Sequence, residues 1–98
     1  MWRVGVSFES NRPADEVRRQ TVQPLGTVLF DGGWGIQTDH LEQPTGRQVD
    51  GCAVIEHLLV CEVHDFERAL RFLRSQLEPQ ADIGTLRFHN LTDNRPIY

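Results

Sequence analysis

A carboxylate and an imidazole stand side by side at Asp39 and His40, a few residues after a glycine-rich segment. A carboxylate can orient an imidazole for proton transfer, which is the basis of general acid–base catalysis. Asp39 and His40 are therefore the catalytic candidates of this sequence. The alternative interpretation places both on an exposed polar hairpin. Because the sequence shows no complete catalytic set, we favour a role other than that of an enzyme.

Trp34 is the second candidate, because it stands among three glycines in the segment from Asp31 to Gly35. The glycines give the backbone conformational freedom, and the indole has a large apolar surface to bury. One hypothesis is that Trp34 binds a small ligand in a pocket beside it. The other is that the ring folds back and covers the sheet edge or extends the core.

Imidazole and thiolate groups at His57, Cys61 and His64 suggest a zinc site, but their spacing argues against it. On one strand, His57 and Cys61 share a face at a separation of about 13 Å, and His64 faces the other way. These three side chains cannot converge on one ion. We predict no metal site and no cofactor, with His57 as a structural histidine and Cys61 as a buried thiol.

The composition excludes several classes of protein. All ten basic residues are arginine, so a Schiff-base enzyme, a pyridoxal phosphate enzyme and a Walker-type phosphate loop each lack the required lysine. The net charge of −4 gives no general attraction to nucleic acid. No apolar run approaches the ~20 residues that span a bilayer, and no signal peptide is evident. We expect a cytoplasmic protein with reduced thiols at Cys52 and Cys61, and no membrane or nucleic-acid partner.

The elements that position these residues follow from hydrophobic periodicity and turn signals. A strand is predicted over 2–9, where apolar and polar residues alternate, and Pro13 begins a helix that ends near Gln23 because Pro24 and Gly26 follow. The remaining predicted elements are a short strand over 27–30 that resumes over 36–40, a hairpin turn over 44–46, a long strand over 49–63, a helix over 66–77 and a strand over 83–89. We expect Asp65 to cap the second helix, and a loose tail over 91–98.

This order of strand, helix, strand, strand, helix, strand predicts a ferredoxin-like α+β sandwich, with both helices on one face of a four-stranded antiparallel sheet. A small barrel is the structural alternative. The whole chain, 1–98, is one domain on this interpretation, because 98 residues bury a single core.

The opposite face of that sheet is left uncovered, and the even positions of the long strand place Val54, Leu58 and Val60 on it. Apolar side chains on an open sheet favour face-to-face packing of two copies. A self-associating interaction module with these residues in a homodimer interface is therefore the leading hypothesis. A small-ligand-binding module near Trp34 and a small dimeric enzyme that uses Asp39 and His40 are the alternatives.

Overall fold

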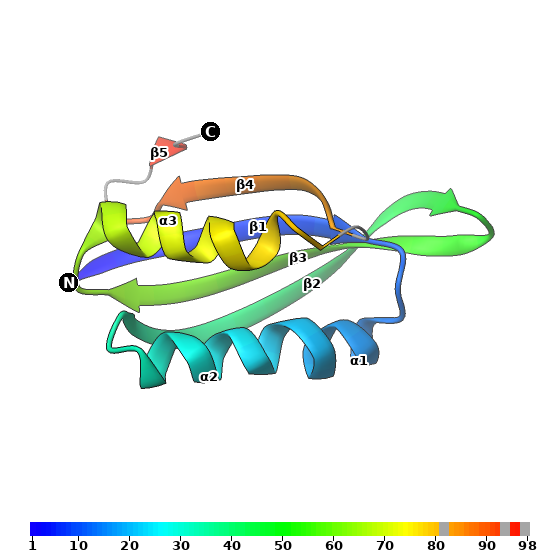
Figure 1. Ribbon diagram of the computed structural model, residues 1–98. Coiled ribbons are helices and arrows are strands. Elements are labelled where there is room, and N and C mark those ends of the chain that lie inside the picture. The colour runs from blue at the N-terminus through cyan, green and yellow to red at the C-terminus, as the bar shows by residue number, and fades with distance from the viewer. Residues whose placement is uncertain (81–82, 93–94, 97–98) are drawn as a thin grey trace.

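The computed structural model describes residues 1–80, 83–92 and 95–96. Its elements are β1 (Trp2–Ser10), α1 (Ala14–Val17), the π-helical turn η1 (Arg18–Val22), α2 (Gln23–Asp31), β2 (Gly35–Val49), β3 (Cys52–Val63), α3 (Phe66–Leu77), β4 (Gly84–Asn90) and the short β5 (Arg95–Pro96). The segments α1, η1 and α2 follow one another without a gap and form one long helix (Figure 1). Among the described residues, no helix is both long and apolar enough to cross a bilayer.

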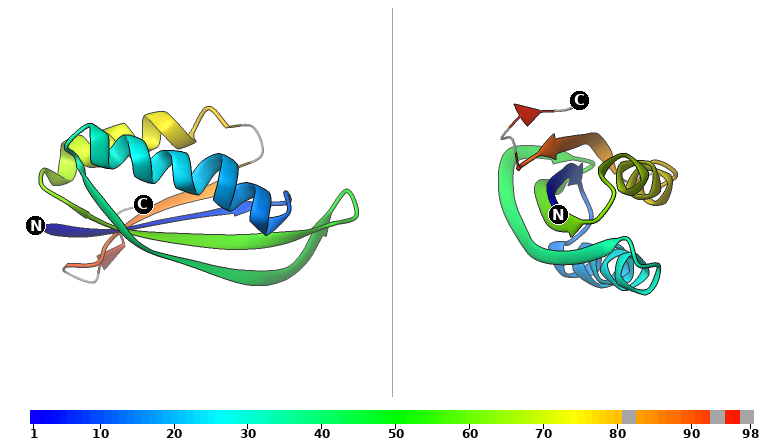
Figure 2. Two further views of the ribbon diagram at one scale, coloured as in Figure 1. Left: turned by 90° about the horizontal axis from the view of Figure 1, so that it is seen from below. Right: turned by 90° about the vertical axis from the view of Figure 1, so that its left-hand side faces the viewer.

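The strands form one antiparallel sheet in the order β2-β3-β1-β4-β5. The end-on view in Figure 2 shows that the long N-terminal helix and α3 lie together on one face of this curved sheet. The architecture is therefore α+β, with two helices on one side of four main strands. The far part of the β2–β3 hairpin extends beyond both helices (Figures 1 and 2).

The hydrophobic core lies between the sheet and the two helices. Strand alternation puts every second residue of β1 and β3 on this face, and the helices contribute residues three or four positions apart. The buried core residues of the strands are Val4, Val6, Phe8, Leu59, Cys61, Val63 and Phe88, and those of the helices are Val17, Val22, Leu25, Leu29, Ala69, Leu73 and Leu77.

The first helix is longer than predicted, because residues 27–30 belong to α2 and not to a strand. Pro24 is the second residue of α2 and lies inside this continuous helix. The π-helical turn η1 stands directly before it, and such a turn changes the hydrogen-bond register where a proline would otherwise clash. Pro24 and Gly26 therefore do not end the helix, and the second strand begins only at Gly35.

The hairpin turn lies at Asp50 and Gly51, not over 44–46 as predicted. Val49 pairs with Cys52 across the turn, and both central residues have positive φ, 54° and 76°. A two-residue turn with this backbone, type I′, matches the twist of the strands and prefers Asp-Gly. Residues 45–47 instead form an irregularity within β2, so this strand extends to Val49.

The second half of the fold agrees with the sequence prediction. The side chain of Asp65 accepts a hydrogen bond from the backbone N–H of Arg68 and caps α3. The predicted strand over 83–89 corresponds to β4, with Phe88 buried against the helices. At the start of the predicted loose tail, the backbone N–H of Leu91 donates a hydrogen bond to the carbonyl of Arg3, and the Thr92 hydroxyl accepts one from the Arg3 N–H. Residues 93–94 and 97–98 of that tail lie outside the described residues.

Candidate functional site

The structure separates the two predicted catalytic residues. Neighbours on a strand point to opposite faces, and the Asp39 carboxylate accepts a hydrogen bond from the backbone N–H of His40 rather than from its ring. The His40 ring lies instead on the helix side of the sheet, with its Nε2 atom 2.9 Å from Nδ1 of His57. Asp39 and His40 therefore do not form the predicted proton-transfer pair.

His40 belongs to a different cluster, which the β2–β3 register assembles. Glu42 lies directly opposite His57, and His40 is two residues away on the same side of β2. The Glu42 carboxylate accepts hydrogen bonds from Nε and Nη2 of Arg18 on η1. Nδ1 of His40 is 3.9 Å from a Glu42 oxygen. Two imidazoles, a carboxylate and a guanidinium thus meet at the edge of the core.

Burial controls the charge of this cluster. Removal from water, together with the nearby His40, lowers the pKa of His57 to about 4. Burial also lowers the pKa of His40. Hydrogen bonds from Arg18 lower the pKa of the Glu42 carboxyl, so this group is ionised. At neutral pH the cluster therefore holds two neutral imidazoles beside an ion pair.

Trp34 packs on α3 at the turn between α2 and β2. Its ring stacks on Phe72 with centroids 4.9 Å apart, and the Arg68 guanidinium carbon lies 5.1 Å from the indole centroid. These contacts extend the core, as one of the two sequence interpretations had it. A cavity of about 160 Å³ adjoins the ring, lined by Gly32, Gly33, Trp34, His64, Asp65 and Arg68. This volume is below the ~300 Å³ at which ligand pockets begin.

The three predicted interface residues are less exposed than expected. Val54 and Val60 are buried in the single chain, and Leu58 is half-buried. A side chain at Gly5 would lie 3.2 Å from Leu91 and 3.4 Å from Leu58, so the segment after β4 covers this part of the sheet. The expected exposure of the two valines is therefore wrong, because the chain buries them itself.

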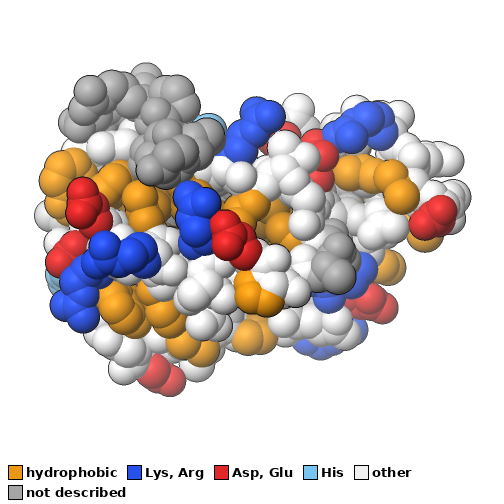
Figure 3. Space-filling model, turned by 45° about the horizontal axis from the view of Figure 1, so that its top comes forward, with side chains coloured by type: hydrophobic (Ala, Val, Ile, Leu, Met, Phe, Trp, Pro, Cys, Tyr) orange, Lys and Arg blue, Asp and Glu red, His pale blue; other side chains and the backbone are white. Residues whose placement is uncertain are grey.

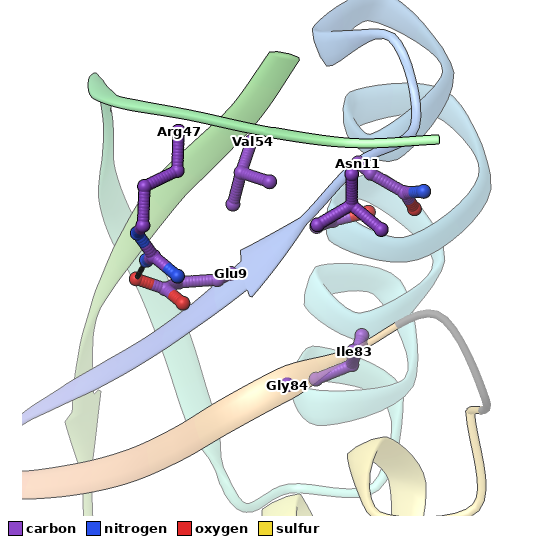
Figure 4. A pocket seen from close by; sticks show the side chains of 8 residues that line it. Glu9, Asn11, Arg47, Val54, Ile83 and Gly84 are labelled. Atoms are coloured by element: carbon purple, nitrogen blue, oxygen red, sulfur yellow. Dashed lines mark hydrogen bonds and ion pairs between the residues drawn. The ribbon is translucent and has the colours of Figure 1, made fainter. Parts of the chain in front are cut away.

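A cavity of about 320 Å³ lies at one end of the sheet, where β1 ends and β4 begins beside the base of the protruding hairpin. Apolar side chains line part of it, and a polar group closes one side: Arg47 and Glu9 point toward one another in Figure 4 and form an ion pair. The lining residues are Glu9, Ser10, Asn11, Arg47, Val49, Val54, Ile83 and Gly84.

Glu9 is held in place from two sides. One carboxylate oxygen accepts a hydrogen bond from Arg47, and the other accepts one from the hydroxyl of Thr85 at 3.1 Å. The Arg47 hydrogen bond lowers the pKa of Glu9, so the carboxyl is charged. Thr85 has φ of 54°, a conformation that β-branched residues rarely adopt. Strained backbone of this kind concentrates at functional sites.

A second, smaller hollow of about 170 Å³ continues along the open face and shares Glu9 with the first. Glu56, Arg87 and His89 add charged and titratable groups to its lining. On the side of the molecule shown in Figure 3, arginine and acidic side chains are interspersed with exposed hydrophobic ones. The linings of the two hollows contain acidic side chains, Glu9 and Glu56, and arginines, Arg47 and Arg87, so both signs of charge are present.

Sequence reasoning missed the partners in both clusters. The sequence does indicate Glu42 as a partner of His40, because residues two positions apart on a strand share a face. Glu9 and Arg47 carry none, because they stand 38 positions apart and meet only through the hairpin.

No protein-family model, curated protein or solved structure matches this chain.

Proposed function

We propose that this protein is a small-ligand-binding domain whose ligand occupies the cavity between Glu9, Arg47, Val54 and Ile83. The observation that carries the proposal is an open, partly apolar hollow with the Glu9–Arg47 ion pair on one side. Ligand pockets in proteins combine mostly apolar walls with a few fixed polar groups. At about 320 Å³, this cavity suits a molecule of the size of one amino acid.

The charges of the cavity favour a zwitterion with an aliphatic body. The Glu9 carboxylate has spare acceptor capacity beyond its two hydrogen bonds, because an ionised carboxylate offers about four lone-pair sites. More than half of the Arg47 side chain is exposed, so its guanidinium has donors available. A ligand ammonium pairs with Glu9, a ligand carboxylate pairs with Arg47, and an aliphatic side chain fills the space along Val54 and Ile83.

The arrangement of the helices and the sheet is compatible with this proposal. We assign the chain to the ferredoxin-like class, on the basis of the element order and the neighbour order β2-β3-β1-β4. One domain with the helices on one face leaves the other face for binding. Cys52 and Cys61 are free thiols, which supports a cytoplasmic location.

Self-association through Val54, Leu58 and Val60 is the weaker proposal, because only Leu58 of the three keeps appreciable exposure. Other apolar side chains are more exposed than these, among them Phe30 at 67% and Leu41 at 53%. Light scattering on the wild-type chain and on Leu58→Asp tests the proposal. A monomer in both samples at micromolar concentration contradicts it, and a dimer that Leu58→Asp dissociates supports it.

The ligand proposal is tested by calorimetric titration with leucine and its two half-molecules. Isocaproate lacks the ammonium group of leucine, and isoamylamine lacks the carboxylate. Leucine should bind at least about tenfold more tightly than either, since each charged contact contributes on the order of 1.5 kcal/mol or more. Glu9→Gln should weaken the binding of leucine and isoamylamine but not of isocaproate. Arg47→Met should weaken the binding of leucine and isocaproate but not of isoamylamine.

Glu67→Gln and Arg71→Met are the matched controls, because they make the same changes on the exposed surface of α3. Both should leave leucine binding unchanged. Absence of binding by all three compounds contradicts the proposed ligand class. Equal binding of all three, or equal losses in the control variants, contradicts the role of the Glu9–Arg47 pair.

A further inference from the structure

We propose that His40, Glu42 and His57 form a binding site for a divalent transition-metal ion, zinc in the first instance. One ligating atom from each residue lies within 4.8 Å of the other two. Two imidazoles and one carboxylate are a common set of protein ligands for zinc, which leaves a fourth position for water. The site faces the helices, and it is separate from the Glu9–Arg47 cavity on the opposite face of the sheet.

The antiparallel register of β2 and β3 is what builds this site. Glu42 pairs with His57, and His40 pairs with Leu59, which belongs to the core. Since side chains alternate along a strand, all three ligands project from the same side of the sheet. Two of them come from one strand and one from its neighbour, so regular secondary structure holds the whole set. Sites on strands are more precise than sites on loops.

The distance between the two imidazoles is close to the distance that zinc requires. Nε2 of His40 and Nδ1 of His57 are 2.9 Å apart. Two zinc–nitrogen bonds of about 2.0–2.1 Å at a tetrahedral angle place the nitrogens about 3.3 Å apart. The two rings therefore need to move by only a few tenths of an ångström. The Glu42 oxygen, which lies within 4.8 Å of both, has to move closer to them. Burial keeps both rings neutral, and neutral imidazole is the form that binds a metal.

Packing alone does not account for a histidine at position 57. The residue is fully buried, its ring stacks on Phe8, and its Nε2 atom has no hydrogen-bond partner among the residues that the structure describes. An unsatisfied buried polar atom destabilises a fold, whereas phenylalanine would occupy the same position without one. His57 therefore serves something other than core packing, and its other nitrogen faces His40.

In the structure, the Arg18 guanidinium donates hydrogen bonds to the Glu42 carboxylate. These hydrogen bonds have to break before Glu42 can bind a metal ion. About half of the Arg18 side chain is exposed, so the guanidinium can turn into solvent. Part of the Glu42 side chain is also exposed, at 25%, which gives an ion a path from the surface. An exposed ion pair contributes at most about 1 kcal/mol. Arg18 therefore competes with the metal ion for the Glu42 carboxylate. This competition lowers the affinity for the metal but does not prevent binding.

The test is a titration of the full chain with Co²⁺, followed by its visible absorption, and with Zn²⁺, followed by calorimetry. Every sample carries Cys52→Ser, because the exposed Cys52 thiol is itself a metal ligand. We expect one ion per chain with the absorption of a tetrahedral Co²⁺ site. His40→Gln and Glu42→Gln should each weaken binding by at least about tenfold. Arg18→Met should tighten binding by up to about fivefold, which corresponds to the loss of the competing pair.

His64→Gln and His89→Gln are the matched controls, because both histidines lie outside the cluster, and binding should be unchanged in them. His57→Phe should abolish Co²⁺ binding while the metal-free chain unfolds at an unchanged or higher temperature, which separates loss of the site from loss of the fold. The proposal is overturned if the parent chain gives no tetrahedral Co²⁺ spectrum. It is equally overturned if His40→Gln and Glu42→Gln bind as tightly as the two controls.

Discussion

His57 is neutral in the folded protein over a pH range in which it gains a proton when unfolded. Burial lowers the pKa of this residue from 6.5 to about 4. The unfolded chain therefore binds one proton more than the folded chain between these values, and acid favours unfolding there. At the scale of single residues, His57, one of the proposed metal ligands, thus also makes the folded protein less stable in acid.

A pH series of urea unfolding tests this behaviour in metal-free buffer. For the wild-type chain, the free energy of unfolding should fall by roughly 3 kcal/mol as the pH decreases from 6.5 to 4 because of His57 alone. His57→Phe should lack this part of the decrease and retain only the part due to carboxyl groups. Parallel pH profiles for the two proteins would contradict the lowered pKa.

Thr85 is the second residue whose local state has a measurable consequence. Its φ of 54° is strained for a β-branched residue, and its hydroxyl donates to Glu9. Thr85→Ala and Thr85→Gly both remove that hydrogen bond, but only glycine also removes the strain. Thr85→Gly should therefore be more stable than Thr85→Ala by about 1 kcal/mol in urea unfolding. Equal stability of the two variants would show that the backbone is not strained.

At the scale of elements, the N-terminal helix shows how a local signal misleads. Val17, Thr21, Leu25 and Leu29 are buried at four-residue intervals, which is the spacing of one helix face. Pro24 stands between Thr21 and Leu25, and a proline inside a helical pattern usually marks the end of a helix. The π-helical turn before it lets the helix continue, and no residue preference predicts such a turn.

The predicted position of the hairpin turn, over 44–46, is wrong for a related reason. Thr45 and Gly46 follow Pro44 and have the composition of a turn, but so do Asp50 and Gly51. Which of the two becomes the turn depends on the pairing of β2 with β3 over a dozen residues. By contrast, α3 and β4 were predictable because the Asp65 cap and the apolar period of α3 agree locally.

Gly35 tests how closely the start of β2 must approach β3. A Cβ atom there would lie 2.0 Å from the carbonyl oxygen of Glu62, which is part of the β3 backbone. Gly35→Ala should therefore separate the strands and destabilise the fold by several kcal/mol, as overpacking does. Gly84→Ala is the control, because nothing lies within 4 Å of the added atom. Thermal unfolding compares them, and similar melting temperatures would contradict this close approach.

At the scale of the whole molecule, the sheet separates two kinds of chemistry. The helix side holds His40, Glu42 and His57 at the edge of the core, and the other side carries the Glu9–Arg47 cavity. Sequence patterns predicted the layers, because strand and helix periodicity are local properties. They did not predict the sites, because each depends on residues that only the register of β2 brings together.

The most direct test of the proposed function is the mapping of amide chemical shifts by NMR during titration with leucine. The proposal predicts saturable shifts that cluster at the cavity lining, at Glu9, Asn11, Arg47, Val54 and Gly84. Amides beside Trp34 and in the His40 cluster should not change. Shifts that cluster around Trp34 instead, or no shifts at saturating leucine, would contradict the proposal that this cavity binds a small zwitterion.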